Sequence, residues 1–431
     1  MTDDAFSAER RCFDLPYLHS AVRDVSIDRI MKITRRLFAF LAFTTLLAVL
    51  ALAGAAGRPP ASHKYLAFVG TYTNKTDSKG IYAYEFDAET GKLAAKGLAV
   101  ATPDPSFVAI HPNGKFVYAV NESGKQSAVS AFALDAQSGK LTLLNQLPAL
   151  GEDPCYITFD KTGKYVLIAN YTSGSVVVFP ILADGKLGEH TAHLTDTGVP
   201  GPNKERQEGP HAHWIGLSAR NRFAYVADLG LDRVFIYNFD AAKGTLARSD
   251  ATSPDTKANS AVPSDAFSAN LSPGTGPRHV AFSADGKIMY VLGELQSTVT
   301  VFANDARETY RQIQWVSALP EGFSGRNDAA EIALHPSGKW LFTSNRGHDS
   351  IAVFAVDPQK GTLQRTGDFP TGGKEPRHFA IDPTGRFLLA ENQHSNSIVV
   401  FGIDPATGAL TQVSKTEGIP SPVCLVFLPT P

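Results

Sequence analysis

One strand-like segment recurs seven times along the chain, and this repeat constrains the fold more than any other feature of the sequence. The copies are rich in β-branched and aromatic residues, which favour strands, and two of them, "SIAVFAVD" and "SIVVFGID", are nearly identical. Most copies run into a Gly-containing turn such as "PQKGTL" or "PATGAL", which suits a hairpin. The copies occupy residues 80–87, 128–135, 175–182, 233–240, 298–305, 350–357 and 397–404.

A second motif precedes most copies and reads as a strand, a tight turn and another strand. It is clearest in "PRHVAFSADGKIMYVLG" (277–293) and "PRHFAIDPTGRFLLAEN" (376–392). Each repeat unit therefore contains four short antiparallel strands. Strand repeats of about fifty residues, with no helical period between them, are typical of sheets arranged around an axis. The sequence predicts an all-β fold, a seven-bladed β-propeller of four-stranded antiparallel blades.

The two ends of the repeat region complete each other. The tail "PVCLVFLP" (422–429) reads as a lone first strand, and "YLAFVGTYT" (65–73) reads as a second strand whose first strand is missing. We therefore expect the C-terminal strand to join the N-terminal blade and to close the ring without a covalent link. Residues 65–431 then form a single propeller domain, preceded by a short linker over 57–64.

A leader precedes the repeats. From Lys32 the chain has a basic start, an apolar run and then small residues, which is the pattern of an export signal over 31–56. The stretch "TRRLF" (34–38) is similar to the twin-arginine type of bacterial signal. The apolar run is nearly long enough to span a bilayer, so an uncleaved membrane anchor is the alternative. We expect a periplasmic or secreted protein, membrane-anchored if the leader is retained, and interpret residues 1–30 as a mis-assigned start before Met31.

Charge and cysteine content narrow the possible partners. The 40 Lys and Arg residues nearly balance the 42 Asp and Glu residues, giving a net charge of -2, so nothing favours a nucleic-acid partner. Cys155 and Cys424 are far apart in the sequence, and we expect two buried thiols in strands rather than a disulfide framework. The expected assembly is a monomer or a weak dimer, and no membrane contact is expected of the propeller itself.

Alignment of the repeats on their turn glycine shows where the unusual residues fall. In a propeller the first strand of each blade lines the central channel, so its start and the end of the second strand face a shared mouth. The first strand starts with Ser106, Cys155, His213, Arg278, Ala330, Arg377 and Val423, followed by Phe107, Tyr156, Trp214, His279, Glu331, His378 and Cys424. The second strand ends at Glu122, Tyr171, Leu229, Glu294, Arg346 and Gln393. Charged residues in such positions are costly unless they bind a ligand or pair with one another.

Structural roles are alternatives for several of these residues. Arg278 and Arg377 could instead bridge blades through backbone carbonyls or through Glu331. Side chains alternate along a strand, so His279 and His378 are expected to face away from the channel as packing groups.

Other recurrent residues have simpler expected roles. His111 and His335 lie in turns on the opposite face and are expected to be solvated. The "HAH" stretch (211–213) could be a metal pair, but no third ligand is identifiable, so no metal is expected. Four asparagines are expected to hold turns by hydrogen bonds. These are Asn121, Asn170, Asn345 and Asn392.

Several motifs, taken in order, resemble the seven-bladed lactonase family, which includes bacterial 6-phosphogluconolactonases and fungal carboxy-muconate lactonising enzymes. The matching stretches include "QEGPHAH" (207–213), "GPRHVAFSADGK" (276–287) and "SNRGHDSIAVFAVD" (344–357), and the resemblance covers about 65–429. It implies an active site in the channel mouth that uses no metal and no cofactor. The catalytic residues it implies are His213, Arg278, Glu294 and Arg346, with His211 as an alternative to the first.

The resemblance implies hydrolysis of a sugar-type lactone, as in 6-phosphogluconolactonases. Ring opening needs an activated water, cations near the developing oxyanion and a proton for the leaving alkoxide. Glu294 and His213 are candidates for the base or acid. The expected substrate-binding residues are His211, His279, Arg377 and Gln393. Lactonisation of a carboxy-muconate and a non-catalytic binding module are the alternatives, since a fold alone does not determine activity.

Two irregular stretches, 188–209 and 247–275, interrupt the repeats. They are rich in Pro, Ser, Asn and Gly, and are therefore expected to be loops rather than strands. The first leads directly into "GPHAH" and could overhang the mouth as a lid; an ordinary surface loop is the alternative.

Overall fold

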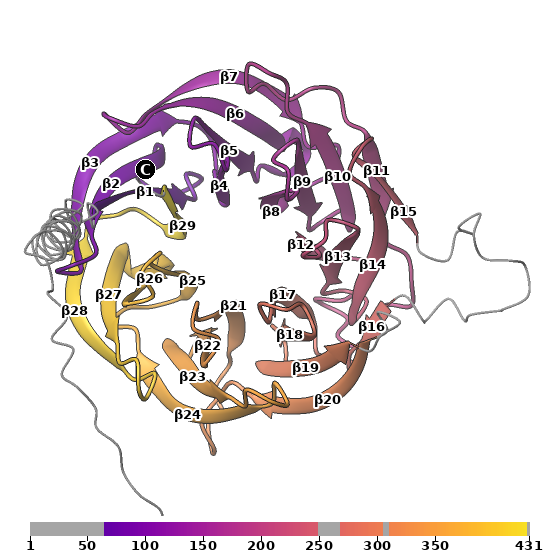
Figure 1. Ribbon diagram of the computed structural model, residues 1–431, viewed down its shortest axis with the longest axis vertical. Helices are drawn as coiled ribbons and strands as arrows, with labels where there is room; N and C mark the ends of the chain where they lie inside the picture. Colours follow the sequence, from indigo (N-terminus) through magenta and orange to yellow (C-terminus); the bar gives the residue numbers. More distant parts are fainter. Residues whose placement is uncertain (1–63, 249–267, 305–309, 429–431) are drawn as a thin grey trace, which may run out of the picture. The chain divides into compact units, whose positions relative to one another are not determined.

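Seven antiparallel β-sheets form a ring around a central channel (Figure 1). The structure is a computed structural model that describes residues 64–248, 268–304 and 310–428. The predictions for residues 1–56 concern a part of the chain outside these ranges. Within them, no helix is long and apolar enough to cross a membrane.

Each blade carries its strands in order from the channel outward, as Figure 1 shows. The closure blade consists of β29 (Pro422–Leu428), β1 (Lys64–Thr71), β2 (Gly80–Asp87) and β3 (Lys92–Ala101). The next blade consists of β4 (Val108–Ile110), β5 (Phe116–Asn121), β6 (Ala128–Asp135) and β7 (Lys140–Pro148). It is followed by β8 (Pro154–Phe159), β9 (Tyr165–Asn170), β10 (Ser175–Pro180) and β11 (Ala192–Thr195).

The remaining blades follow the same plan, with one additional strand. The blade β12–β15 has β12 (Ala212–Leu217), β13 (Phe223–Asp228), β14 (Arg233–Asp240) and β15 (Thr245–Arg248), and β16 (Ser268–Asn270) also pairs with β14. The next has β17 (Pro277–Phe282), β18 (Ile288–Gly293), β19 (Thr298–Asn304) and β20 (Tyr310–Ser317). The last two have β21 (Asp328–Leu334), β22 (Trp340–Arg346), β23 (Ser350–Val356) and β24 (Leu363–Pro370), then β25 (Pro376–Ile381), β26 (Phe387–Asn392), β27 (Ser397–Ile403) and β28 (Leu410–Glu417). Short 3-10 turns lie at Gly124–Gln126 and Gln393–Ser395.

The predicted architecture is confirmed, including the closure of the ring. The C-terminal strand β29 pairs antiparallel with β1, with Leu428 opposite Leu66 and Cys424 opposite Gly70. This pairing joins the two ends of the repeat region by backbone hydrogen bonds. The recurrent aromatic segments of the sequence are the third strands of the seven blades.

The hydrophobic core lies between the blades. One buried cluster packs Tyr290 and Val301 of blade β17–β20 against Leu341 and Phe354 of blade β21–β24. Equivalent clusters lie between other neighbouring blades. A sheet alternates its side chains between two faces, so each blade buries both faces only when it has a neighbour on each side. The ring satisfies this requirement for all seven blades at once.

The two irregular stretches contain more regular structure than predicted. β11 lies in the first stretch as the outer strand of its blade, and β16 lies in the second. Both strands are short and at the edge of a sheet, four and three residues long, so each offers too few residues for a strand pattern to stand out from the surrounding loop. Residues 249–267 of the second stretch are outside the described ranges.

The turn rim is the end of the ring at which the first and second strands of each blade join. His111 Nε2 lies 2.8 Å from the carbonyl oxygen of Gly163, and His335 Nε2 lies 2.7 Å from that of Gly385. Each contact joins one blade to the next, so the expectation that these histidines are solvated is wrong. The sequence alone suggests that a histidine in a turn is exposed, because the turn of the next blade that covers it lies some fifty residues away along the chain.

The predictions for the asparagines and cysteines are confirmed. Each of the four asparagine side chains donates a hydrogen bond to a carbonyl oxygen of the loop that enters its blade, for example Asn345 Nδ2 to Ala318 O at 2.8 Å. Cys155 and Cys424 are free, buried thiols in β8 and β29.

Candidate active site

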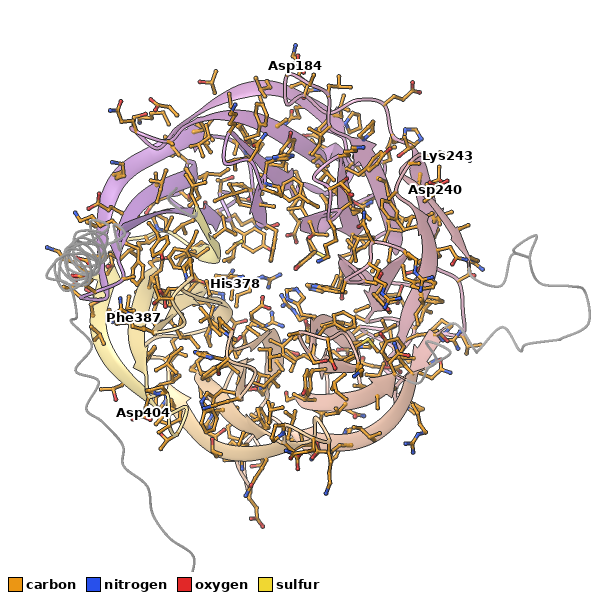
Figure 2. All side chains as sticks on the ribbon, viewed as in Figure 1. Asp184, Asp240, Lys243, His378, Phe387 and Asp404 are labelled. Atoms are coloured by element: carbon orange, nitrogen blue, oxygen red, sulfur yellow. The ribbon has the colours of Figure 1, made fainter. Side chains whose placement is uncertain are left out.

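The starts of the inner strands line a narrow, mostly polar cavity. Figure 2 shows His378 near the centre of the ring, whereas Asp184, Asp240 and Asp404 lie along its outer side. Most of the first predicted column lines the cavity: Ser106, Cys155, His213, Arg278, Arg377 and Val423. The alignment of the repeats therefore placed these side chains in the correct position.

The second column also contributes to the cavity, although His279 and His378 were expected to face away from it. Phe107, His279, Glu331 and His378 are among the lining residues. The reason is a β-bulge at the start of the inner strands. In β17 the register passes from Pro277 directly to His279, and leaves Arg278 without a partner. A bulge breaks the alternation of side chains and re-aims them, so adjacent residues can both face the channel.

The bulge recurs in neighbouring blades at equivalent positions. The unpaired residue is Cys155 in β8, His213 in β12 and Arg377 in β25, and in β21 both Ala330 and Glu331 are skipped. Bulges are common next to active sites, where they direct a side chain toward a ligand. The same backbone irregularity therefore presents cysteine, histidine and arginine side chains from different blades to the channel.

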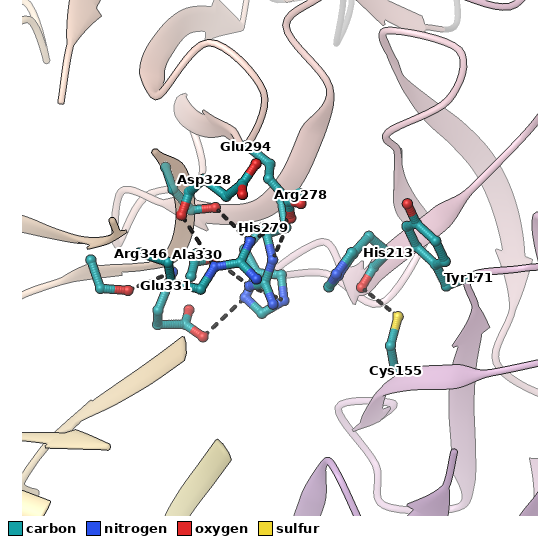
Figure 3. Close-up of polar contacts among 12 residues, drawn as sticks. Cys155, Tyr171, His213, Arg278, His279, Glu294, Asp328, Ala330, Glu331 and Arg346 are labelled. Carbon is teal, nitrogen blue, oxygen red and sulfur yellow. Dashed lines mark hydrogen bonds and ion pairs between the residues drawn. The ribbon is translucent and has the colours of Figure 1, made fainter. Parts of the chain in front are cut away.

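Glu294 follows β18 and contacts three arginines, of which Figure 3 labels Arg278 and Arg346. Its Oε2 lies 2.9 Å from Arg278 Nε and 3.0 Å from Arg346 Nη2. Its Oε1 accepts a hydrogen bond of 2.6 Å from Arg206 Nη2. Burial opposes ionisation, but the guanidinium groups, that of Arg346 foremost, lower the pKa of Glu294 to about 2. The side chain is therefore a carboxylate throughout the physiological pH range.

Arg278 and Arg346 are themselves anchored by backbone carbonyls. Arg278 Nη1 donates to Ala330 O, so this arginine bridges two blades, which was the structural alternative to a binding role. It also faces the cavity. Burial, together with the charge of Arg346, lowers the pKa of Arg278 to about 10, so it remains charged at neutral pH. Arg346 Nε donates to Asp328 O at 3.1 Å. These contacts hold two guanidinium groups close together on either side of one carboxylate.

Arg206 was not among the residues predicted from the sequence. It lies in the 188–209 stretch, is about one-third exposed (32% of its side chain), and reaches both Glu294 and, at 3.6 Å, Asp328. Its Nη2 also lies 3.4 Å from the hydroxyl of Tyr171. The stretch therefore contributes a residue to the mouth, as the overhang interpretation suggested. The only sign of Arg206 in the sequence is that a charged residue shortly precedes "GPHAH". The alignment of the repeats could not select it, because this loop has no counterpart in the other blades.

His213 is buried in the cavity wall, with 4% of its surface exposed. Its Nδ1 has no hydrogen-bond partner among the described residues. Its ring makes edge contacts with Tyr171 and His279, at centroid distances of 5.6 Å and 5.2 Å. Burial, and next the charge of Arg278, lower the pKa of His213 well below its usual range. The imidazole is therefore neutral, and one ring nitrogen is left to interact with a ligand.

Two predicted binding residues lie elsewhere. His211 stacks on Tyr171 at 4.5 Å, with Nδ1 3.1 Å from the Tyr171 carbonyl and Nε2 3.2 Å from Glu208 Oε1. It does not line the cavity with His213. Gln393 lies in a separate depression that also includes Lys75 and His394. In the described part of the chain, no group of three or more His, Cys, Asp or Glu side chains is arranged to hold a metal ion.

A second cationic corner lies across the cavity. Arg377 sits over the ring of Tyr72, 5.3 Å from its centroid, and the Tyr72 hydroxyl donates to Glu122 Oε2 at 2.8 Å. Burial raises the pKa of Glu122, while the charge of Arg377 opposes this shift. The cavity thus has a guanidinium group on each of two sides, those of Arg278 and Arg377.

A propeller with this mouth matches known proteins over nearly its whole length. Residues 66–427 match the family model described as a lactonase with a 7-bladed β-propeller. The chain belongs to this lactonase family. It is 37% identical to a 6-phosphogluconolactonase of Bacillus subtilis (strain 168) over 85% of this chain and 99% of that protein. It is 34% identical to a 6-phosphogluconolactonase of Formosa agariphila over 72% of this chain and 85% of that protein.

Among solved structures, a periplasmic gluconolactonase of Pseudomonas aeruginosa is similar to this lactonase-family chain, with a TM-score of 0.76 and 32% identity. The match covers 85% of this chain and 100% of that protein. Both the family and the fold expected from the sequence motifs are thereby confirmed.

Proposed function

We propose that the protein hydrolyses a sugar-type lactone at the channel mouth, in the manner of a 6-phosphogluconolactonase. The observation that carries the proposal is the grouping of Glu294, Arg278 and Arg346 beside a cavity that also exposes the neutral imidazole of His213. These four residues are the proposed catalytic group. Arg377, at the opposite corner, is the proposed substrate-binding residue.

The proposed reaction begins when His213 removes a proton from a water molecule that attacks the lactone carbonyl carbon. The new C–O bond forms as the carbonyl π electrons move to oxygen, and the guanidinium groups of Arg278 and Arg346 stabilise this oxyanion. The ring C–O bond then breaks, and the imidazolium of His213 returns its proton to the leaving alkoxide. Each such group typically contributes roughly 10²- to 10⁴-fold to the rate.

Glu294 has a different role in this proposal. The sequence did not decide which of Glu294 and His213 acts as the general base or acid. A carboxyl group with a pKa of about 2 carries no proton to donate at neutral pH, and both oxygens of Glu294 are already engaged by arginines, whereas the ring of His213 has an unpartnered nitrogen. Glu294 instead holds the arginines in place and allows them to lie close together despite their like charge.

Three observations favour an unphosphorylated substrate such as δ-gluconolactone over its 6-phosphate. The leader is similar to an export signal, and the similar Pseudomonas aeruginosa protein is a periplasmic gluconolactonase. Arg278 and Arg346 already share the Glu294 carboxylate, and a phosphate dianion would compete with it for them. We therefore propose a periplasmic or secreted enzyme, acting as a monomer or weak dimer.

The test is a lactonase assay with three substrates: δ-gluconolactone, its 6-phosphate and a carboxy-muconolactone, each corrected for spontaneous hydrolysis. We expect turnover of the sugar lactones and a strong loss in Glu294→Gln. The matched control is Glu85→Gln, which removes a carboxylate from an exposed ion pair with Lys64. Turnover of the muconolactone alone would assign the lactonising reaction, and no turnover of any substrate at any pH would indicate a binding module.

A further inference from the structure

Behind Arg278 lies a buried row of acidic and histidine side chains that the proposed reaction does not use. It runs from Glu391 in β26 through His378 in β25 and Glu331 in β21 to His279 in β17. The row thus crosses three neighbouring blades. None of its members is more than 8% exposed. Burying this many ionisable groups is costly unless each has a partner.

The contacts along the row are close and continuous. Glu391 Oε2 lies 2.6 Å from His378 Nδ1, and His378 Nε2 lies 3.5 Å from Glu331 Oε2. Glu331 Oε2 also lies 3.0 Å from His279 Nδ1. His279 Nε2 lies 3.3 Å from Arg278 Nη1, which ends the row at the proposed oxyanion site. Figure 3 shows the contacts from Glu331 through His279 to Arg278.

The donors and acceptors at the arginine end determine one tautomer. A guanidinium group only donates, so the Nε2 of His279 must accept from Arg278. The ring proton of neutral His279 is therefore on Nδ1, and it is donated to Glu331. Burial, together with the charge of Arg278, lowers the pKa of His279 well below its usual range, which keeps the ring neutral.

The other end of the row is determined in the same way. The backbone N–H of Leu425 donates to His378 Nδ1 at 3.4 Å, so this nitrogen is an acceptor. Glu391 must then donate its own proton to Nδ1 and is a neutral carboxylic acid. Burial raises its pKa well above the usual range, and its Oε1 accepts no hydrogen bond from the described residues. His378 carries its proton on Nε2, directed at Glu331.

Glu331 is the point at which both histidines converge. Its Oε2 accepts from His279 and faces His378, and its Oε1 accepts from the backbone N–H of Ile332 at 3.0 Å. Burial raises the pKa of Glu331, yet three donors directed at it favour the ionised form. Both ring nitrogens of His279 are engaged, so His279 is not available to bind substrate as the sequence suggested.

We propose that Glu331 and its two histidines are positioning residues, which hold the His279 tautomer that accepts the Arg278 N–H and thereby orient this guanidinium for the oxyanion. The inference rests on the proposed function for its catalytic consequence. Ala330 O and Glu294 restrain the same guanidinium at Nη1 and Nε. Among the described residues neither Nε nor Nη2 has a hydrogen-bond partner; Nε lies in an ion pair 2.9 Å from Glu294, and Nη2 is the group that would reach the substrate.

The first test is nitrogen NMR of the full-length wild-type protein labelled at histidine. The signals of His279 and His378 are assigned by their disappearance in the His279→Gln and His378→Gln variants. We expect neutral rings with the proton on Nδ1 of His279 and on Nε2 of His378. A proton on Nε2 of His279 would overturn the proposal, because that nitrogen could not then accept from Arg278.

The second test is steady-state kinetics of Glu331→Gln. Groups that support a reacting side chain typically contribute about 10- to 100-fold, so we expect kcat to fall by that factor with KM nearly unchanged. The control is Asp382→Asn, which removes a buried carboxylate that binds Thr384 and Phe387 at the turn rim. It should lower stability but leave kcat unchanged.

The two tests give distinguishable failures. A folded Glu331→Gln variant with wild-type kcat would reject the positioning role. If this variant does not fold, the NMR measurement on the wild-type protein decides. A wild-type protein that hydrolyses no lactone would reject the proposed function, whereas a wrong tautomer would reject only this inference.

Discussion

The two ends of the inner strands differ in a way that separates scaffold from function. At the turn rim the blades repeat themselves: His111 and His335 make the same contact to the next blade through Gly163 and Gly385. At the mouth the equivalent positions carry a different side chain in almost every blade. The repeated contacts belong to the scaffold, and the varied side chains of the mouth are the candidates for acting on a ligand.

The physical costs of the two ends also differ. At the turn rim the buried carboxylates of Asp160 and Asp382 accept hydrogen bonds from the backbone N–H groups of their own turns, so each is satisfied locally. The mouth buries Glu294, Arg278 and Arg346 side by side, and each would be strongly destabilising without the others. Such an arrangement is retained where charge is needed for recognition or catalysis.

The largest expected effect contrasts two arginines that make the same backbone contact at opposite ends. Arg278 Nη1 donates to Ala330 O at the mouth, and Arg386 Nη2 donates to Ala88 O at the turn rim. Loss of an oxyanion-stabilising donor costs about 10²- to 10³-fold, so Arg278→Ala should lower kcat by that factor. Arg386→Ala should leave kcat unchanged. Equal losses in both variants would show that the arginines act through the fold alone.

The second prediction concerns the dependence of stability on pH. The folded-state pKa of Glu294, about 2, lies below its ordinary value of 4.5. Glu294 therefore stabilises the fold above about pH 5, and this contribution is lost as the pH falls toward 2. The shift corresponds to about 3 kcal/mol, so Glu294→Gln should lower the free energy of unfolding by about that amount at pH 7 and by much less at pH 3.

Denaturant unfolding at both pH values measures this difference. The control is Glu417→Gln, which removes a carboxylate from an exposed pair with Lys415. If the Glu294→Gln variant is destabilised equally at pH 7 and pH 3, the arginines do not hold that carboxylate ionised.

The third prediction concerns a substitution at the turn rim, which should lower stability and leave the rate of catalysis unchanged. Gly385 has a φ of +73°, and a Cβ there would lie 3.0 Å from His335 Nε2. A non-glycine residue in this left-handed conformation costs about 1–2 kcal/mol, so Gly385→Ala should lower the free energy of unfolding by about that amount. Its kcat at a temperature well below unfolding should equal that of the wild type. A reduced kcat would mean that the two ends are coupled.

The smallest expected effect concerns the loop arginine. Arg206 reaches Glu294 from a partly exposed position, and Arg278 and Arg346 remain to hold that carboxylate when it is removed. Arg206→Ala should change kcat/KM by roughly tenfold at most, with Lys204→Ala, an exposed neighbour in the same loop, as control. A loss as large as that of Arg278→Ala would place Arg206 in the catalytic group.

The sequence was sufficient to predict the propeller, the closure of its ring and the residues that start each inner strand, because seven copies of one unit can bury their faces only as a ring. The family motifs and the repeat alignment also both selected His213, Arg278, Glu294 and Arg346, and the structure places Glu294 between the two arginines and His213 in the wall of the same cavity as Arg278; their catalytic role stays a prediction. In these cases a local pattern, repeated, determines the position of a side chain in space.

Three features depended on contacts that no local pattern encodes. The bulges turn His279 and Glu331 into the channel against the alternation expected of a strand. The path of one loop brings Arg206 to Glu294, and Gln393 lies in a 3-10 turn beside a separate depression. Each depends on where residues distant in the chain pack, and packing is settled by the whole ring rather than by any one repeat.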